Sequence, residues 1–281
     1  MLEPVYMLAI DHRWQWEEWC DANGVDRARI PEVKSLAAEA FLTARDSSDA
    51  IRRCGAVLVD LTYGRAAFDA VQAAGAVAGN PAERAGAFPL EWTADFSTAL
   101  PGHFVKVLVR HRSDQAPEIV ARQREQLLEL QRWCAERGKP FVLEVLATPA
   151  EGEQDRFDSH GRPGRLATYI TDAYAIGIKP DYWKIEGMPD RAALTIVDEA
   201  IRTVPGPRQL ILGKGAGMDQ VRQWFGSAAG SVTAAGFAIG RTVYFDAAAH
   251  WLTGALSREE AMSRIRTNYQ AVIDHWTEIA P

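Results

Sequence analysis

Asp181-Tyr-Trp-Lys-Ile-Glu-Gly-Met-Pro-Asp-Arg-Ala-Ala-Leu-Thr-Ile-Val-Asp-Glu-Ala-Ile-Arg202 holds the structural unit from which the fold can be inferred. Its first part, residues 182–186, is a short and mainly apolar run, which is typical of a strand covered on both faces. Its last part, residues 192–202, has the periodicity of a helix. A strand followed by a helix is the repeating unit of a parallel α/β fold.

The same unit recurs along the whole chain. We expect eight strands, at residues 5–10, 56–61, 88–92, 104–110, 141–146, 182–186, 210–213 and 236–239. Helices are expected at residues 14–22, 31–44, 65–74, 117–137, 165–176, 192–202, 218–225, 247–252 and 258–275. No Gly-x-Gly-x-x-Gly follows the first strand, which disfavours a dinucleotide-binding sheet. The alternation therefore predicts an α/β protein, a single-domain (β/α)8 TIM barrel over residues 1–281.

The composition is that of a globular, acidic chain. Of 281 residues, 47% are hydrophobic and 24% are charged, and the formal net charge is -6. Nucleic-acid binding would require a basic stripe, which is missing. No basic leader and no run of eighteen apolar residues is found, so we expect a cytoplasmic protein without a membrane segment. A small anion could still bind locally to a few arginines, and formation of a homo-oligomer stays open.

Polar and glycine residues gather where the predicted strands end. In a TIM barrel the active site lies at the carboxyl ends of the strands, so these residues are the candidates for function. Ionisable groups inside a barrel cost several kcal/mol unless they are paired, and their number here predicts a site. The candidates are Asp11, Arg13, Asp60, Glu91, Lys106, Arg110, Glu144, Lys184, Gly213, Lys214, Gly240 and Arg241.

Lysines are few, which allows the candidates among them to be narrowed. Lys34 lies on a predicted helix, and Lys139 and Lys179 precede strands, at the opposite end of the barrel. The remaining three are Lys106, Lys184 and Lys214.

Lys184 has the most apolar surroundings, because it lies between Trp183 and Ile185. Desolvation would lower its pKa toward neutrality, and Lys106 would lower it further if it lies within about 6 Å. A neutral amine can attack a carbonyl and form a Schiff base. The alternative is that Lys184 only forms a structural ion pair with Glu144 or Glu186.

Two further positions have both a chemical and a structural interpretation. Glu144 is placed to carry protons, or it is a counter-ion of the lysines. Gly240 and Arg241 follow the last strand, where barrels commonly bind phosphate, or they form a turn with a solvated arginine. The histidines show no ligand spacing, so we expect no metal, and the alternative is that His12, His111 and His160 converge on one. We expect no cofactor.

A long polar loop, residues 148–165, follows the fifth predicted strand. It contains four basic residues, Arg156, His160, Arg162 and Arg165. Its length at the catalytic end suggests a lid or an anion clamp, and a plain surface loop is the alternative.

Seven strings of sequence resemble, in matching order, a bacterial aldolase-like domain. They are Leu8-Ala-Ile-Asp-His-Arg13, Val59-Asp-Leu-Thr-Tyr-Gly64, Pro89-Leu-Glu-Trp92, Val105-Lys-Val-Leu-Val-Arg110, Leu143-Glu-Val145, Gly177-Ile-Lys-Pro-Asp-Tyr-Trp-Lys-Ile-Glu186 and Gly236-Phe-Ala-Ile-Gly-Arg-Thr242. This domain is often fused behind 5-dehydro-2-deoxygluconokinase in inositol catabolism. The chain is more distantly similar to tagatose-1,6-bisphosphate and sulfofructose-phosphate aldolases, which are class I barrels.

The resemblance implies roles for five residues. Lys184 matches the Schiff-base lysine, and Glu144 matches the proton-transfer carboxylate. Asp11 and Lys106 match polar site residues, and Arg241 matches the phosphate anchor. We therefore expect a lyase that needs no metal and no cofactor, and that cleaves a phosphorylated keto sugar or keto acid.

The expected substrate is 2-deoxy-5-keto-gluconate 6-phosphate, which would give dihydroxyacetone phosphate and malonate semialdehyde. Its carboxylate would bind Arg13, Arg110 or an arginine of the loop 148–165, since arginine offers bidentate geometry. One alternative is an aldolase for a sulfonated or bisphosphorylated ketose. Another is a barrel without catalytic activity that binds a sugar phosphate.

Overall fold

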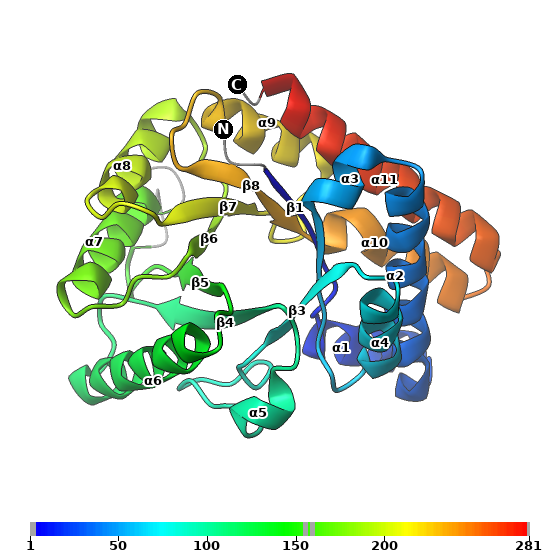
Figure 1. Cartoon of the computed structure of the whole chain (residues 1–281), viewed down its shortest axis with the longest axis horizontal. Helices are drawn as coiled ribbons and strands as arrows, with labels where there is room; N and C mark the ends of the chain where they lie inside the picture. The colour runs from blue at the N-terminus through cyan, green and yellow to red at the C-terminus, as the bar shows by residue number, and fades with distance from the viewer. Residues whose placement is uncertain (1–3, 154–156, 158–160, 280–281) are drawn as a thin grey trace.

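The eight strands form one closed parallel barrel, ringed by helices (Figure 1). The structure is a computed structural model that describes residues 4–153, 157 and 161–279. The strands pair in chain order and β8 closes onto β1. They are β1 Val5–Ala9, β2 Gly55–Leu58, β3 Val77–Pro81, β4 Phe104–His111, β5 Phe141–Ala147, β6 Tyr182–Glu186, β7 Arg208–Leu212 and β8 Ala234–Ile239. The predicted single-domain (β/α)8 fold is confirmed.

The helices cover the outside of the barrel, where their apolar faces bury the strands. They are α1 Trp14–Asn23, α2 Ile30–Asp46, α3 Asp49–Cys54, α4 Arg65–Ala73, α5 Phe96–Ala99, α6 Pro117–Glu136, α7 Arg162–Ala175, α8 Arg191–Arg202, α9 Met218–Ala228, α10 Arg241–Leu252 and α11 Arg258–Ile279, with a 3-10 turn η1 at Arg27–Arg29. None of the described helices is both long enough and apolar enough to cross a lipid bilayer.

The barrel interior is apolar at its amino-terminal end and charged at its carboxyl end. A second core cluster, separate from the helix-facing core, includes Met7, Leu58, Phe104, Val142 and Leu210. Side chains of a strand alternate between the two faces, so the residue two positions further along also points inward. The next inward layer therefore carries lysine and glutamate, and it lies directly above an apolar floor.

The third predicted strand, residues 88–92, is wrong. The strand is Val77–Pro81, and residues 88–92 lie in the segment after it, where Trp92 forms an antiparallel bridge with Glu83. Gly79 is needed because an added Cβ would lie 2.3 Å from the Phe104 ring. The prediction failed because β3 contains glycine, asparagine and proline and so lacks the apolar run that indicates a strand. Residues 88–92 are more apolar and were chosen instead.

The tenth helix also begins earlier than predicted. α10 starts at Arg241, directly after β8, and not at residue 247. Val243 and Tyr244 in its first turn are buried against the core. This earlier start matters for function, because it puts the amino terminus of α10 at the mouth of the barrel.

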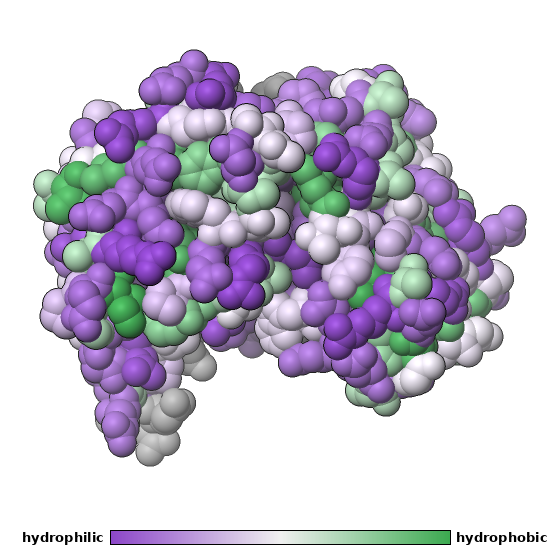
Figure 2. All heavy atoms as spheres, turned by 90° about the horizontal axis from the view of Figure 1, so that it is seen from below, coloured by the Kyte–Doolittle hydropathy of each residue, from purple (hydrophilic) through white to green (hydrophobic). Residues whose placement is uncertain are grey.

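Polar side chains cover most of the face of the molecule shown in Figure 2, and apolar ones form small groups between them. Scattered apolar side chains are normal on a protein surface and indicate no particular partner.

The contact between Gly79 and Phe104 makes a test of the β3 assignment. We expect Gly79→Ala to lower the free energy of unfolding by about 1–3 kcal/mol, because the methyl group overpacks the ring. Gly226→Ala is the matched control: Gly226 lies in α9 with nothing within 4 Å of an added Cβ. There alanine should stabilise the helix by about 0.5–1 kcal/mol. Urea unfolding measures both values, and equal effects of the two changes would contradict the assignment.

Candidate active site

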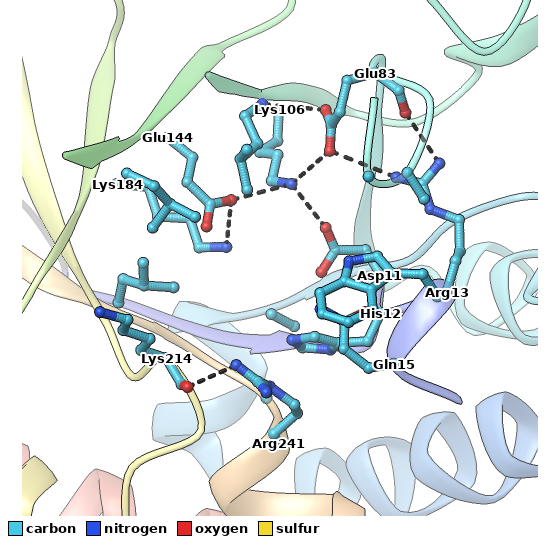
Figure 3. A pocket seen from close by; sticks show the side chains of 18 of the residues that line it. Asp11, His12, Arg13, Gln15, Glu83, Lys106, Glu144, Lys184, Lys214 and Arg241 are labelled. Atoms are coloured by element: carbon cyan, nitrogen blue, oxygen red, sulfur yellow. Dashed lines mark hydrogen bonds and ion pairs between the residues drawn. The ribbon is translucent and has the colours of Figure 1, made fainter. Parts of the chain in front are cut away.

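A cavity of about 120 Å³ opens at the carboxyl end of the strands. Figure 3 shows charged side chains from several strands converging on it. Ten of the twelve predicted candidates line the cavity. They are Asp11, Arg13, Lys106, Arg110, Glu144, Lys184, Gly213, Lys214, Gly240 and Arg241.

Lys184 and Glu144 lie opposite each other on neighbouring strands, in register. The Lys184 Nζ donates a hydrogen bond of 2.8 Å to the Glu144 Oε2. Both side chains are almost fully buried, at 4% and 5% exposure. The ion pair of Lys184 with Glu144, which the sequence analysis gave as an alternative to Schiff-base chemistry, is therefore present, and it lies inside the cavity.

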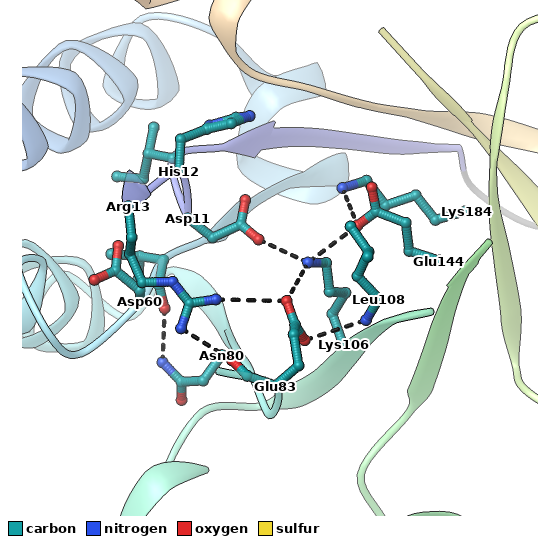
Figure 4. Close-up of polar contacts among 12 residues, drawn as sticks. Asp11, His12, Arg13, Asp60, Asn80, Glu83, Lys106, Leu108, Glu144 and Lys184 are labelled. Atoms are coloured by element: carbon teal, nitrogen blue, oxygen red, sulfur yellow. Dashed lines mark hydrogen bonds and ion pairs between the residues drawn. The ribbon is translucent and has the colours of Figure 1, made fainter. Parts of the chain in front are cut away.

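Lys106 is the centre of the charge cluster (Figure 4). Its Nζ lies 2.9 Å from the Asp11 Oδ2, 2.8 Å from the Glu83 Oε1 and 3.0 Å from the Glu144 Oε2. Burial opposes the charged forms of these groups, but the ion pairs outweigh it. Lys106, followed by Lys184, holds the pKa of Asp11 far below its usual range despite burial. The carboxylates, Asp11 first, hold the pKa of Lys106 well above its usual value.

Glu83 is a site residue that sequence reasoning missed. Besides Lys106 it binds the guanidinium of Arg13, whose Nη1 donates to the Glu83 carbonyl at 3.0 Å. Its Oε2 accepts a hydrogen bond from the Leu108 backbone N–H at 3.1 Å. Glu83 follows β3 by two residues, so the misplaced third strand hid it. The sequence signal for Glu83 is a carboxylate two residues after Pro81, the position of a strand-end residue if residues 77–81 had been predicted as the third strand.

Lys34 is the second residue that sequence reasoning set aside, because it lies on a helix. It reaches from α2 into the barrel wall, fully buried, and its Nζ donates to the Asp60 Oδ1 at 2.8 Å. It also donates to the backbone carbonyls of Ile10 and His12. Burial, opposed by Asp60, lowers the pKa of Lys34. Lys34 and Asp60 thus lie behind the cavity and fix the segment that carries Asp11.

The side of the cavity away from Lys106 and Glu83 is built from glycines and Arg241 (Figure 3). The Arg241 Nη2 donates to the Lys214 carbonyl at 2.6 Å, and Lys214 adopts a positive φ of 50°. Gly240 cannot be replaced without movement, since a Cβ would lie 1.8 Å from the Ala9 carbonyl oxygen. The Lys214 ammonium is half exposed and lies 3.0 Å from Glu186.

Two candidates do not line the cavity. Asp60 is paired with Lys34, and Glu91 is an exposed partner of Arg84 at 2.6 Å. In the loop 148–165, Arg165 pairs with Glu153 at 2.8 Å, and Arg162 contacts Glu186.

Arg156 and His160 lie outside the described residues, so the lid stays a prediction. Within the part of the chain that the structure describes, no three His, Cys, Asp or Glu side chains are grouped to hold a metal ion.

The buried pair of Lys34 and Asp60 predicts a large effect on stability. Lys34→Met should lower the free energy of unfolding by about 3–5 kcal/mol, because it leaves a buried carboxylate without its partner. Arg65→Met removes an exposed pair with Asp69, at 3.8 Å, and should change stability by no more than about 0.5 kcal/mol. Urea unfolding of both variants measures the difference, and a mild effect at Lys34 would refute the anchoring role.

Solved structures share the architecture of this chain. An archaeal fructose 1,6-bisphosphate aldolase matches with a TM-score of 0.58 and 16% identity, over 96% of this chain and 94% of that one. A Schiff base forming fructose-1,6-bisphosphate aldolase matches with a TM-score of 0.55 and 16% identity, over 96% and 94%. The fructose-bisphosphate aldolase of Plasmodium falciparum has a TM-score of 0.63 and 13% identity, over 95% and 89%. At these identities the likeness shows the fold.

The sequence itself gives a family. No curated protein matches the chain. Residues 1–280 match the family described as uncharacterized protein conserved in bacteria, DUF2090. The chain, a (β/α)8 barrel with a buried lysine and glutamate pair at its mouth, belongs to this family.

Proposed function

We propose that this protein is a class I aldolase that cleaves a phosphorylated keto sugar or keto acid. The observation that carries the proposal is the Lys184 amine, buried at the mouth of the barrel and hydrogen-bonded to the Glu144 carboxylate at 2.8 Å. Such an amine can form a Schiff base with a ketone. The likeness to the fold of a Schiff base forming aldolase supports the same chemistry.

The two buried lysines differ in the number of carboxylates that contact them. Lys106 has three carboxylates within 3.0 Å, which keep it positively charged. Lys184 has one carboxylate partner among the described residues, and this carboxylate also contacts Lys106. Glu144 would therefore still be paired with Lys106 if Lys184 reacts as a neutral amine. We infer that Lys184, and not Lys106, is the nucleophile.

The reaction follows from this arrangement. The Lys184 Nζ bonds to the ketone carbon, and the carbonyl oxygen leaves as water with protons relayed by Glu144. The hydroxyl on the second carbon from the iminium carbon then gives its proton to Glu144. The bond between that carbon and the carbon next to the iminium breaks, and its electron pair moves toward the iminium nitrogen. The aldehyde fragment departs. The enamine that remains takes up a proton, and water releases the second product and restores Lys184. Asp11 lies beside Lys106, where it can accept hydrogen bonds from substrate hydroxyls.

The phosphate of the proposed substrate can bind at the amino terminus of α10, directly after β8. The backbone N–H groups in the first turn of a helix have no partner within it, and the helix dipole favours an anion there. In this chain α10 begins at the cavity with Gly240 and Arg241, and Gly213 lies beside them. We assign the phosphate to this side of the cavity.

The other end of the substrate would be a carboxylate, as in 2-deoxy-5-keto-gluconate 6-phosphate. Arg13 is committed to Glu83, with its side chain 7% exposed. Arg110 lines the cavity, is exposed, and has no ion pair within the described residues. Arg110 is therefore the better candidate for a carboxylate, and the products would be dihydroxyacetone phosphate and malonate semialdehyde.

Covalent trapping tests the Schiff base directly. Incubation with dihydroxyacetone phosphate and borohydride should leave one reduced adduct, detected by intact mass and mapped to Lys184. Lys184→Arg keeps the positive charge beside Glu144 but cannot form the adduct. Lys179→Met, a change at an exposed lysine that precedes β6, should keep it. If the wild type gives no adduct, the proposed Schiff-base chemistry is wrong, and a barrel that only binds a sugar phosphate is the alternative that remains.

The carboxylate assignment predicts a selective effect on binding. Arg110→Met should raise the KM for the keto acid phosphate about 10–100-fold, because a charge-assisted hydrogen bond contributes about 1.5–3 kcal/mol. The KM for a ketose bisphosphate without a carboxylate should change little. Arg112→Met is the matched control, since Arg112 pairs with Asp114 outside the cavity. Steady-state kinetics of both variants with both substrates measure the effect on KM. If the wild type prefers a sulfonated or bisphosphorylated ketose, the proposed substrate is wrong.

A further inference from the structure

His12 is a cavity residue to which the proposed reaction gives no role. It follows Asp11 at the end of β1, and its ring lies on the same side of the cavity as Arg241 (Figure 3). Its Nδ1 lies 3.3 Å from the Tyr244 hydroxyl, and its Cε1 would lie 2.8 Å from a Cβ added at Gly240. The ring thus contacts α10 through Tyr244 and lies close to Gly240, the residue before that helix.

Tyr244 determines which nitrogen of His12 carries the proton. Its hydroxyl is fully buried, and its oxygen accepts a hydrogen bond from the Trp16 Nε1 at 3.0 Å. Burial raises the pKa of Tyr244, so the hydroxyl keeps its proton. Among the described residues the only acceptor for that proton is the His12 Nδ1. If Nδ1 carried a proton instead, the buried hydroxyl proton would have no partner, which costs about 1–3 kcal/mol.

The consequence is a fixed neutral tautomer with its proton on Nε2. The Nε2 makes no hydrogen bond with any described residue, and the ring lines the cavity. Burial, opposed by Asp11 and reinforced by Arg241, Lys34 and Lys184, holds the pKa of His12 well below its usual range. The ring stays uncharged at neutral pH, and it offers an N–H to whatever occupies the cavity.

We propose that the His12 Nε2–H donates a hydrogen bond to the ketone oxygen of the substrate while Lys184 attacks the ketone carbon. The inference rests on the proposed aldolase function. As the nitrogen–carbon bond forms, the carbonyl electron pair moves to the oxygen, which becomes negative. A neutral N–H donor stabilises this charge without giving up its proton. Tyr244 and Trp16 act as positioning residues behind it.

The tautomer can be measured without any substrate. In ¹⁵N-labelled protein the ring nitrogens of His12 should show the Nε2–H tautomer between pH 6 and pH 8. Tyr244→Phe should release the constraint and give a mixture of tautomers. Tyr174→Phe is the matched control: Tyr174 accepts from the Trp183 Nε1 at 2.9 Å in the same way, outside the cavity. Detection of the Nδ1–H tautomer or of a charged ring in the wild type would overturn the proposal.

Kinetics test the donor role. His12→Ala should slow formation of the borohydride-trapped adduct about 100-fold, the effect of losing one oxyanion donor. His12→Gln restores an N–H at a similar reach and should recover most of the rate. An alanine variant that reacts at the wild-type rate would refute the role even with the predicted tautomer. No adduct on the wild type would refute the aldolase function and this role with it, while the nitrogen spectra would still report the tautomer.

Discussion

The ammonium of Lys106, enclosed by three carboxylates inside the barrel, is the interaction on which the site depends. The carboxylates come from three places in the chain, Asp11 after β1, Glu83 after β3 and Glu144 on β5. A buried charge must be paired, so each of these segments has to be in position for the others to be stable. The cluster therefore fixes Glu144 and, through it, the Lys184 amine. Lys34 serves the same purpose from outside, where it holds the backbone at His12.

Much of this arrangement could be predicted from the sequence. Short apolar runs gave a clear signal at β4, β5 and β6, and the alternation of side chains along these strands placed Lys106, Glu144 and Lys184 inward. Glu83 could not be found in the same way, because β3 consists mainly of small and polar residues. These residues form the strand through contacts in the folded chain, which the sequence pattern does not show. Asn80, for example, donates to the Val59 carbonyl and accepts from the Gly102 N–H.

Lys34 escaped prediction for a different reason. Helical periodicity says that a residue faces the core, but not that a long side chain will cross it to reach a strand end. The partners of Lys34 are 22 to 26 positions away in sequence. Pairing over such distances is a property of the folded chain. The same holds for the contact between His12 and Tyr244, which are 232 residues apart.

The apolar floor formed by Met7, Leu58, Phe104, Val142 and Leu210 has a consequence for the order of events in the proposed reaction. These side chains lie between Lys184 and the amino-terminal end of the barrel, so a substrate would reach Lys184 from the carboxyl ends of the strands. In the proposed reaction both products and the hydrolytic water would use this same opening. The aldehyde would leave through it first, while the other fragment is still bonded to Lys184.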